Sequence, residues 1–321
     1  MNDAVPVIDL APWFHGDAAN RTAVGEAVDE AFQQWGFALV TGHGIPDDVA
    51  ATLRRLARRF FALPCEIKGR YVASPTNGRG WLPPGSEANA FSEGTVSPPD
   101  LKESLSYGAN ASTGDDEVDR IWFRPNPMPC EIAGLAEAIT DYMARMRALA
   151  GQLMEVCAVA LGLPPTFFAE TTDHPSYTFN ANWYPPLTVV GPPEEGQYRI
   201  GPHTDFGTLT LLDREPAEGG LQVFTRDRTW IDVPVRPGAL TVNTGDLLAR
   251  WTGDRWLSAR HRVLPPQASA PDEEMTSLVF FYEANPDALI ESLAPPVGYK
   301  HYTPVYAADY LLEKYTAIAV H

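Results

Sequence analysis

The chain has 321 residues, of which 45% are hydrophobic and 20% charged, so it is long enough and apolar enough to fold around a large core. Its 24 Lys and Arg residues stand against 41 Asp and Glu residues, and the net charge of −17 excludes nucleic acid and anionic membrane surfaces as expected partners. The sequence has no apolar run that would span a membrane and no secretory signal at its start, which indicates a cytoplasmic protein.

The first part of the chain is predicted to alternate short strands with helices. Residues 5–10 predict an edge strand and residues 24–35 a helix, followed by a strand over 37–40 and a helix over 47–60. Residues 72–128 are rich in Gly, Pro, Ser and Asn and show little periodicity. Long irregular segments of this kind usually cover a functional site.

One long amphipathic helix is predicted from Glu131 to Leu161, because apolar residues recur there at helical spacing until Gly162 and Pro164 end it. A shorter final helix is predicted over residues 308–315. Between the two helices, short alternating segments are separated by Gly and Pro, which is typical of a β-sandwich or jelly roll. The expected strands cover residues 177–183, 208–212, 220–224, 230–233, 239–242 and 276–281.

The predicted elements together indicate an α+β fold with a jelly-roll core. Residues 1–165 form an N-terminal helical and irregular section packed on the core, and residues 166–321 form the core itself. Because the sequence shows no internal repeat and no linker, we expect the two sections to make one globule.

The three cysteines, Cys65, Cys130 and Cys157, lie far apart and include no CxxC pair. Their odd number and their spacing exclude a disulfide framework and a thiolate zinc site. Free cysteine is among the most buried residue types, and we expect all three to be buried thiols.

A candidate metal site lies in the β region. His203 and Asp205 are two positions apart, so they point to the same side of a strand or its extension, and His261 follows 56 residues after the aspartate. Two histidines and one carboxylate form the facial triad of non-haem Fe(II) oxygenases, which leaves three adjacent positions for substrate, cosubstrate and O₂. An isolated His-x-Asp pair is also compatible with a surface turn, so the surrounding sequence decides between the two interpretations.

Ordered blocks of sequence surround this pair and extend along the chain, over residues 5–10, 36–46, 100–103, 182–186, 201–212, 219–223, 243–247, 261–263 and 302–306. In these blocks the sequence resembles the Fe(II)/2-oxoglutarate oxygenases of the isopenicillin N synthase type, over nearly its whole length. The resemblance implies a double-stranded β-helix core and implies that His203, Asp205 and His261 are the iron ligands. It further implies that the protein uses O₂ and 2-oxoglutarate to hydroxylate, desaturate or cyclise a small-molecule substrate.

One position departs from the family's pattern. Members carry Arg-x-Ser after the second histidine, where the guanidinium pairs with the distal carboxylate of 2-oxoglutarate or with a substrate carboxylate. Here Met275 stands at the arginine position, while Ser277 is retained. A thioether does not balance a carboxylate, so either another cation takes over or 2-oxoglutarate binds weakly or not at all.

Few residues are candidates for binding the cosubstrate. Arg199 precedes His203 by four residues and shares a side with it if the strand is regular, so it is a candidate cation, although it also fits an ordinary family arginine. Asn182 and Tyr184 match the family's Asn-x-Tyr pair and, with Ser277, offer neutral donors that orient a carboxylate without neutralising it. Packing within the strand is the alternative role for the pair.

Several side chains are expected to wall the substrate pocket, although each of them also fits a structural role. They are Phe206, Leu221, Leu248, Met275 and Phe280 in the β region, and Lys102, Glu103 and Tyr107 in the irregular region.

Three functions are compatible with these features. The first is an Fe(II) oxygenase that uses 2-oxoglutarate with a replacement cation. The second is an iron-dependent oxidase or cyclase that does without 2-oxoglutarate, which Met275 favours. The third is a non-catalytic binding protein, which the intact triad argues against. We expect a small-molecule substrate, no nucleic-acid partner, and a monomer or a small homo-oligomer.

Overall fold

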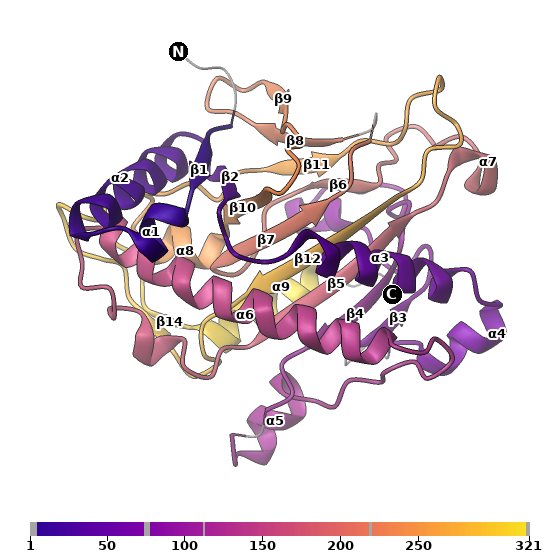
Figure 1. Ribbon diagram of the computed structural model, residues 1–321, viewed down its shortest axis with the longest axis horizontal. Helices are drawn as coiled ribbons and strands as arrows, with labels where there is room; N and C mark the ends of the chain where they lie inside the picture. The colour runs from indigo at the N-terminus through magenta and orange to yellow at the C-terminus, as the bar shows by residue number, and fades with distance from the viewer. Residues whose placement is uncertain (1–4, 74–77, 112, 218–219, 319–321) are drawn as a thin grey trace.

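The structure is a computed structural model, and it describes residues 5–73, 78–111, 113–217 and 220–318. Two facing β-sheets form the centre of the molecule, and helices cover one of them (Figure 1). No helix within the described ranges is both long and apolar enough to cross a membrane.

The larger sheet has eight strands in the order β1-β2-β10-β7-β12-β5-β4-β3. All neighbours are antiparallel except β1 and β2, which pair in parallel. The strands span Val7–Asp9 (β1), Phe37–Thr41 (β2), Gly80–Leu82 (β3), Glu103–Gly108 (β4), Tyr177–Tyr184 (β5), Leu209–Arg214 (β7), Leu240–Thr244 (β10) and Met275–Tyr282 (β12).

The smaller sheet has four strands in the order β6-β11-β8-β9. An apolar cluster with members from both sheets, among them Leu39, Tyr184, Val223 and Met275, fills the space between them. This arrangement confirms the predicted double-stranded β-helix and the α+β class. The strands span Ile200–His203 (β6), Leu221–Phe224 (β8), Trp230–Asp232 (β9) and His261–Val263 (β11), and a separate pair joins Leu289–Ile290 (β13) to Val305–Tyr306 (β14).

Helices cover the other face of the larger sheet, and α3 and α6 cross in front of it in Figure 1. The long helix α6 begins at Leu135 rather than at Glu131, because Gly134 adopts a left-handed conformation with φ +84° and starts the helix there. The helices span Ala11–His15 (α1), Ala18–Gln34 (α2), Asp47–Phe61 (α3), Cys65–Lys68 (α4), Asp116–Trp122 (α5), Leu135–Ala160 (α6), Leu187–Val190 (α7), Asp246–Trp251 (α8) and Ala307–Ile318 (α9), with 3-10 turns at Gly69–Tyr71 (η1), Asn89–Glu93 (η2) and Ala169–Thr171 (η3).

Strand alternation in β12 separates the two cores. Met275 belongs to the cluster between the sheets, whereas Leu278 and Phe280 belong to the cluster that the larger sheet forms with the helices. Both faces of this strand are therefore buried, which explains its nearly continuous apolar sequence.

The first 165 residues do more than pack on the core. They supply β1 and β2 to one edge of the larger sheet and β3 and β4 to the other edge. The two sections expected from the sequence consequently share one sheet.

The expectation that all three cysteines are buried is wrong for two of them. Cys157 is buried in α6, but Cys65 and Cys130 are exposed. Cys65 opens the short surface helix α4 after Pro64, and Cys130 lies in the segment before α6, so neither occupies a position that faces the core.

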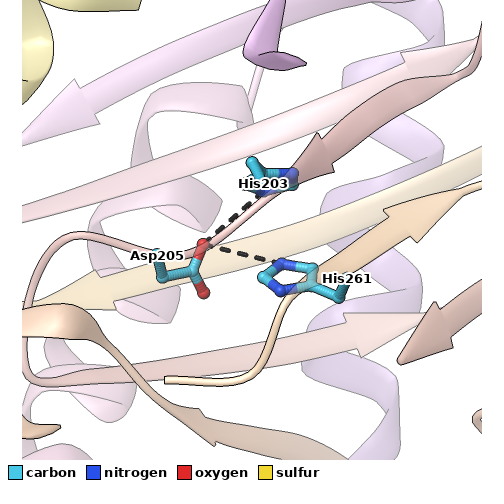
Figure 2. A group of neighbouring side chains, drawn as sticks. All are labelled: His203, Asp205 and His261. Atoms are coloured by element: carbon cyan, nitrogen blue, oxygen red, sulfur yellow. Dashed lines mark ion pairs between the residues drawn. The ribbon is translucent and has the colours of Figure 1, made fainter. Parts of the chain in front are cut away.

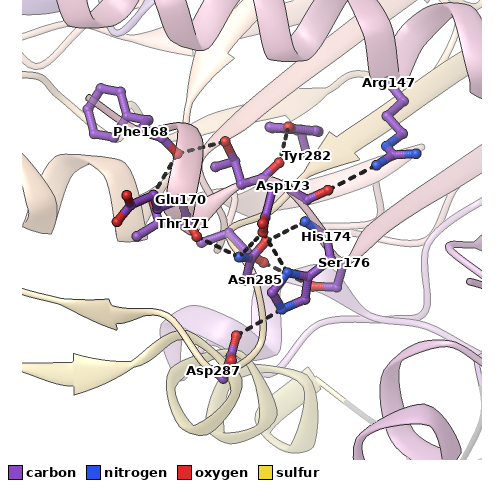
Figure 3. A network of polar contacts seen from close by, with 12 residues as sticks. Arg147, Phe168, Glu170, Thr171, Asp173, His174, Ser176, Tyr282, Asn285 and Asp287 are labelled. Carbon is purple, nitrogen blue, oxygen red and sulfur yellow. Dashed lines mark hydrogen bonds and ion pairs between the residues drawn. The ribbon is translucent and has the colours of Figure 1, made fainter. Parts of the chain in front are cut away.

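A polar network fixes the segment after β12 against the turn before β5 (Figure 3). The buried Asn285 donates from Nδ2 to the Glu170 carbonyl at 3.0 Å and to Asp173 Oδ1 at 2.7 Å, and its Oδ1 accepts from the His174 amide at 3.0 Å. The His174 ring in turn reaches Asp287 at 3.1 Å. Asn285 thus uses both ends of its amide to order the chain next to β12.

Candidate metal centre

The two predicted histidines come from paired strands of the smaller sheet. His203 is the last residue of β6, and His261 is the first residue of β11 and pairs directly with it. Asp205 follows β6 by two residues and points between the two rings, as Figure 2 shows. The antiparallel register therefore brings together three side chains that the sequence separates by up to 58 positions, from 203 to 261.

The three side chains are close enough to share one metal ion. Asp205 Oδ1 lies 3.7 Å from His203 Nε2 and 3.6 Å from His261 Nε2, and one ligand atom from each residue lies within 4.8 Å of the others. All three residues are buried. Metal bonds of about 2.0–2.2 Å require separations of this size, so the predicted gathering of these residues is confirmed.

Backbone carbonyls set the orientation of both rings. His203 Nδ1 lies 2.7 Å from the Gly201 carbonyl, and His261 Nδ1 lies 3.0 Å from the Ala259 carbonyl. Since a carbonyl oxygen only accepts, each Nδ1 carries the proton and each Nε2 keeps its lone pair toward the centre. Two Nε2 lone pairs and a carboxylate are the donor set that suits non-haem Fe(II).

The charge states also suit metal binding. Burial, with the neighbouring His261 adding to its effect, lowers the pKa of His203 to about 4, so this ring is neutral at pH 7. Burial alone raises the pKa of Asp205, but the two histidines and hydrogen bonds from Asn243 and Thr210 outweigh it and lower the pKa overall. The site therefore offers a neutral His203 imidazole and an ionised Asp205 carboxylate.

Asn243 supports the aspartate, and the sequence analysis did not single it out. It lies on β10 and donates from Nδ2 to Asp205 Oδ2 at 2.7 Å, which leaves Oδ1 directed at the histidines. A hint was present in the sequence, because Asn243 opens one of the blocks that carry the family resemblance.

Replacing Asn243 by alanine is expected to weaken metal binding by about 10- to 100-fold, the usual effect of removing a group that orients a ligand. The affinity is measured by titrating the metal-free protein with Mn²⁺ or Fe²⁺ in the absence of O₂. Thr241→Ala, two residues earlier on the same strand, is the matched control. An unchanged affinity in Asn243→Ala would contradict the assigned orienting role.

A cavity opens from the metal-ligand side chains along the space between the sheets. Its wall includes Asn182, Tyr184, Met275 and Ser277, the residues proposed from the sequence to face a cosubstrate. Tyr184 Oη lies 3.1 Å from Ser277 Oγ, and Asn182 Oδ1 accepts from Ser104 Oγ at 2.7 Å. Neutral hydroxyl and amide groups thus gather beside the Met275 thioether.

Arg199 does not line this cavity. Its guanidinium pairs with Glu273 at 2.9 Å and lies over the Tyr184 ring, 5.7 Å from the ring centroid. The register between β6 and β11 shifts along the pair. His261 pairs with His203 and Val263 pairs with Ile200, so two positions on β11 correspond to three on β6. One extra residue in β6 breaks the alternation that the sequence argument assumed, so Ile200 rather than Arg199 faces the cavity with His203.

The residues proposed for the substrate pocket lie in different places. Leu221 lines the cavity. Phe280 and Tyr107 belong to the core on the helix side of the larger sheet, because their strand positions have the opposite parity. Phe206 lies outside the cavity and packs against Tyr315 of α9, with ring centroids 5.9 Å apart.

A second carboxyl group, Glu283, lies next to the metal ligands. It follows β12 and packs so closely on Gly207 that a Cβ added there would lie 1.6 Å from Glu283 Oε2. Burial, and then the charge of Asp205, raises the pKa of Glu283 well above its ordinary value, which favours the neutral acid. Position 207 must therefore be glycine, because any larger residue would clash with the Glu283 side chain.

Arg214 is a cavity-lining residue that the sequence analysis missed. It is the last residue of β7 and follows Thr210 and Leu212, which line the cavity too. A signal was available, because residues 210, 212 and 214 alternate on one face of a predicted strand that extends by two residues.

Two family models match the chain. The model described as "non-haem dioxygenase in morphine synthesis N-terminal" matches residues 5–131, and the model described as "2OG-Fe(II) oxygenase superfamily" matches residues 175–284. The second match contains the whole metal centre.

Characterised relatives resemble the chain over most of its length. It is 43% identical to validamycin A dioxygenase of Streptomyces hygroscopicus subsp. limoneus, over 93% of this chain and 82% of that protein. It is 33% identical to proline hydroxylase buaE of Petromyces alliaceus, over 89% of each chain.

Solved structures share the same architecture. The full-length Neurospora crassa enzyme solved with alpha-KG and thymine superposes with a TM-score of 0.84 at 28% identity, over 99% of this chain and 98% of that chain. JOX2, solved with 2OG, Fe and JA, superposes with a TM-score of 0.77 at 27% identity, over 97% of this chain and 85% of that chain.

Proposed function

Because the chain belongs to the 2OG-Fe(II) oxygenase superfamily, we propose that His203, Asp205 and His261 hold the iron of an oxygenase that acts on a small molecule. The observation that carries this proposal is the convergence of two Nε2 atoms on Asp205 Oδ1, at 3.7 and 3.6 Å, with both Nδ1 atoms engaged by carbonyls. The donor set fits Fe(II) in number, type and protonation.

When bound, the iron supplies the redox and Lewis-acid chemistry that activates O₂. The chain supplies position and a dry environment. Asn243 fixes the carboxylate of Asp205, the Gly201 and Ala259 carbonyls fix the two rings, and the buried apolar walls keep water from the reacting centre.

We further propose that the cosubstrate occupies the cavity beside Asn182, Tyr184 and Ser277, whose hydroxyl and amide groups face the space next to the metal ligands. Family membership favours 2-oxoglutarate as this cosubstrate and disfavours the oxidase or cyclase that does without it. The non-catalytic alternative is disfavoured too, since His203, Asp205 and His261 lie close enough together to hold a metal ion.

For the substrate, a sequence identity of 43% to a validamycin A dioxygenase makes validamycin A, or a compound closely related to it, the first substrate that we propose to test. Three statements stay predictions from the sequence: location in the cytoplasm, the lack of a nucleic-acid partner, and an oligomeric state that is either a monomer or a small homo-oligomer.

The test is a turnover assay with the purified protein, Fe(II), 2-oxoglutarate, O₂ and validamycin A. We expect succinate to form together with an oxidised product, and both to require iron. The Asp205→Ala protein serves as the control without a metal centre. Succinate formation that is equal in the wild type and in this control would contradict the proposed iron site.

Succinate without an oxidised product has a narrower meaning. It supports the iron and cosubstrate assignments and excludes validamycin A as the substrate. Related small molecules are then compared by the extent to which each accelerates succinate release.

A further inference from the structure

The cosubstrate raises a problem of charge. 2-Oxoglutarate carries two carboxylates, and when one end binds a metal the other end must be buried in the cavity. Burying an unpaired carboxylate is strongly unfavourable, so its site needs a cation or several hydrogen-bond donors. The cavity-facing side chains of β12 supply none with a charge, since they are Met275, Ser277, Val279 and Phe281.

Arg214 lies directly across from this gap. It pairs in register with Ser277 on the neighbouring strand, and both side chains line the cavity. Thr210, which hydrogen-bonds Asp205, precedes Arg214 by four residues, or about 13 Å of strand at about 3.3 Å per residue. A metal-bound five-carbon diacid and an extended arginine side chain together are of comparable length.

The charge of Arg214 lacks a counter-ion among the described residues. One of its terminal nitrogens donates to the carbonyls of Val233 and Pro234, both neutral groups. Its Nε is buried and has no hydrogen-bond partner in the described part of the chain. Burial lowers the pKa of Arg214 to about 10, and the charge of Asp232 raises this pKa too little to offset the desolvation.

The other buried cations near the cavity already have carboxylate partners. Arg199 pairs with Glu273, and Lys102 pairs with Glu87. Of the side chains found to line the cavity, Arg214 alone carries a permanent positive charge. An anion entering the cavity therefore meets one cation that lacks a carboxylate partner.

We propose that Arg214 pairs with the distal carboxylate of 2-oxoglutarate, together with the hydroxyls of Ser277 and Tyr184. The charge needed for the cosubstrate then comes from β7 rather than from β12, and Met275 fills the space beside it. This assignment rests on the proposed function, because it presupposes that 2-oxoglutarate is the cosubstrate.

The test compares two ligands on the Mn²⁺-loaded protein by calorimetry. 2-Oxoglutarate is one, and 2-oxopentanoate, which has a methyl group in place of the distal carboxylate, is the other. Arg214→Gln removes the charge but keeps a donor for the Val233 and Pro234 carbonyls. We expect it to weaken 2-oxoglutarate binding by about 10- to 100-fold and to leave 2-oxopentanoate binding nearly unchanged.

Two further variants complete the design. The double variant Arg214→Gln/Met275→Arg returns a guanidinium to the cavity from the adjacent strand, and we expect it to regain at least about tenfold of the lost affinity. Arg199→Met removes a buried arginine that does not line the cavity, and we expect it to keep the preference for 2-oxoglutarate over 2-oxopentanoate.

Each remaining outcome has one meaning. If the wild type binds 2-oxoglutarate and Arg214→Gln binds it equally well, Arg214 is not the partner and only this inference fails. If Arg214→Gln loses affinity for 2-oxoglutarate and for 2-oxopentanoate equally, the residue acts on the structure of the pocket. That result also overturns the inference. If the wild type does not bind 2-oxoglutarate, the proposed function itself fails.

Discussion

Replacing any one of His203, Asp205 or His261 by alanine is expected to abolish stoichiometric Fe(II) binding while the protein stays folded. A facial triad needs all three ligands to hold the metal, and among the described residues the group consists of these three alone. None of the three belongs to the hydrophobic clusters that hold the sheets and helices together. Iron content measured beside the circular dichroism spectrum separates the loss of metal from the loss of fold.

His301→Ala is the matched control, because it removes an exposed histidine that is not part of the metal-ligand group. It is expected to bind iron like the wild type. Near-normal iron content in all three ligand variants would end the assignment of this site.

Replacing Glu103 by alanine is expected to lower the free energy of unfolding by about 3–5 kcal/mol, because it leaves a buried ammonium group without its counter-ion. Lys68 Nζ lies 2.8 and 3.0 Å from the two Glu103 oxygens, and Trp81 Nε1 donates to the same carboxylate at 2.5 Å. Both members of the pair are almost fully buried, with 6% and 3% of their surface exposed. Denaturant unfolding of the wild type and the variant measures the difference.

Two comparisons identify the cause of that loss. In Lys68→Met/Glu103→Leu both charges are removed, and we expect a smaller loss than in Glu103→Ala. In Asp141→Ala an exposed ion pair with Arg145 is broken, and we expect a loss below about 1 kcal/mol. A Glu103→Ala protein as stable as the wild type would show that the buried pair contributes little.

Glu103 is a candidate for the substrate pocket from the sequence, but its contacts with Lys68 and Trp81 are those of a structural residue.

Much of the architecture was predictable from local pattern. The apolar repeat that leads to Leu161 gave the long helix, and the short alternating segments gave the jelly roll, because burial on one face imposes the period of each element. The candidate metal ligands were predictable for other reasons. His203 and Asp205 are close in sequence, and His261 was found through the family resemblance.

The cavity was less predictable, because its composition depends on how strands pair over long distances. The sequence leaves Phe280 open between the pocket and the core, and the structure places it in the core, because the adjacent Val279 and Phe281, which have the opposite parity, face the cavity. Arg199 is a candidate cation only if β6 alternates regularly, and an extra residue in β6 breaks that alternation. Alternation along β7 puts Arg214 on the same face as Thr210 and Leu212, but only the pairing of β7 with β12 places it opposite Ser277.

The most direct test of the account is an anaerobic titration of the Fe(II)-loaded wild-type protein with 2-oxoglutarate, followed by visible absorption. Chelation of Fe(II) by the 2-oxo acid produces a weak metal-to-ligand charge-transfer band. We predict that this band appears and saturates at one equivalent per protein, and that it is absent when Asp205 is replaced by alanine. A wild-type protein that holds Fe(II) but develops no such band, at any concentration of 2-oxoglutarate, would contradict the account.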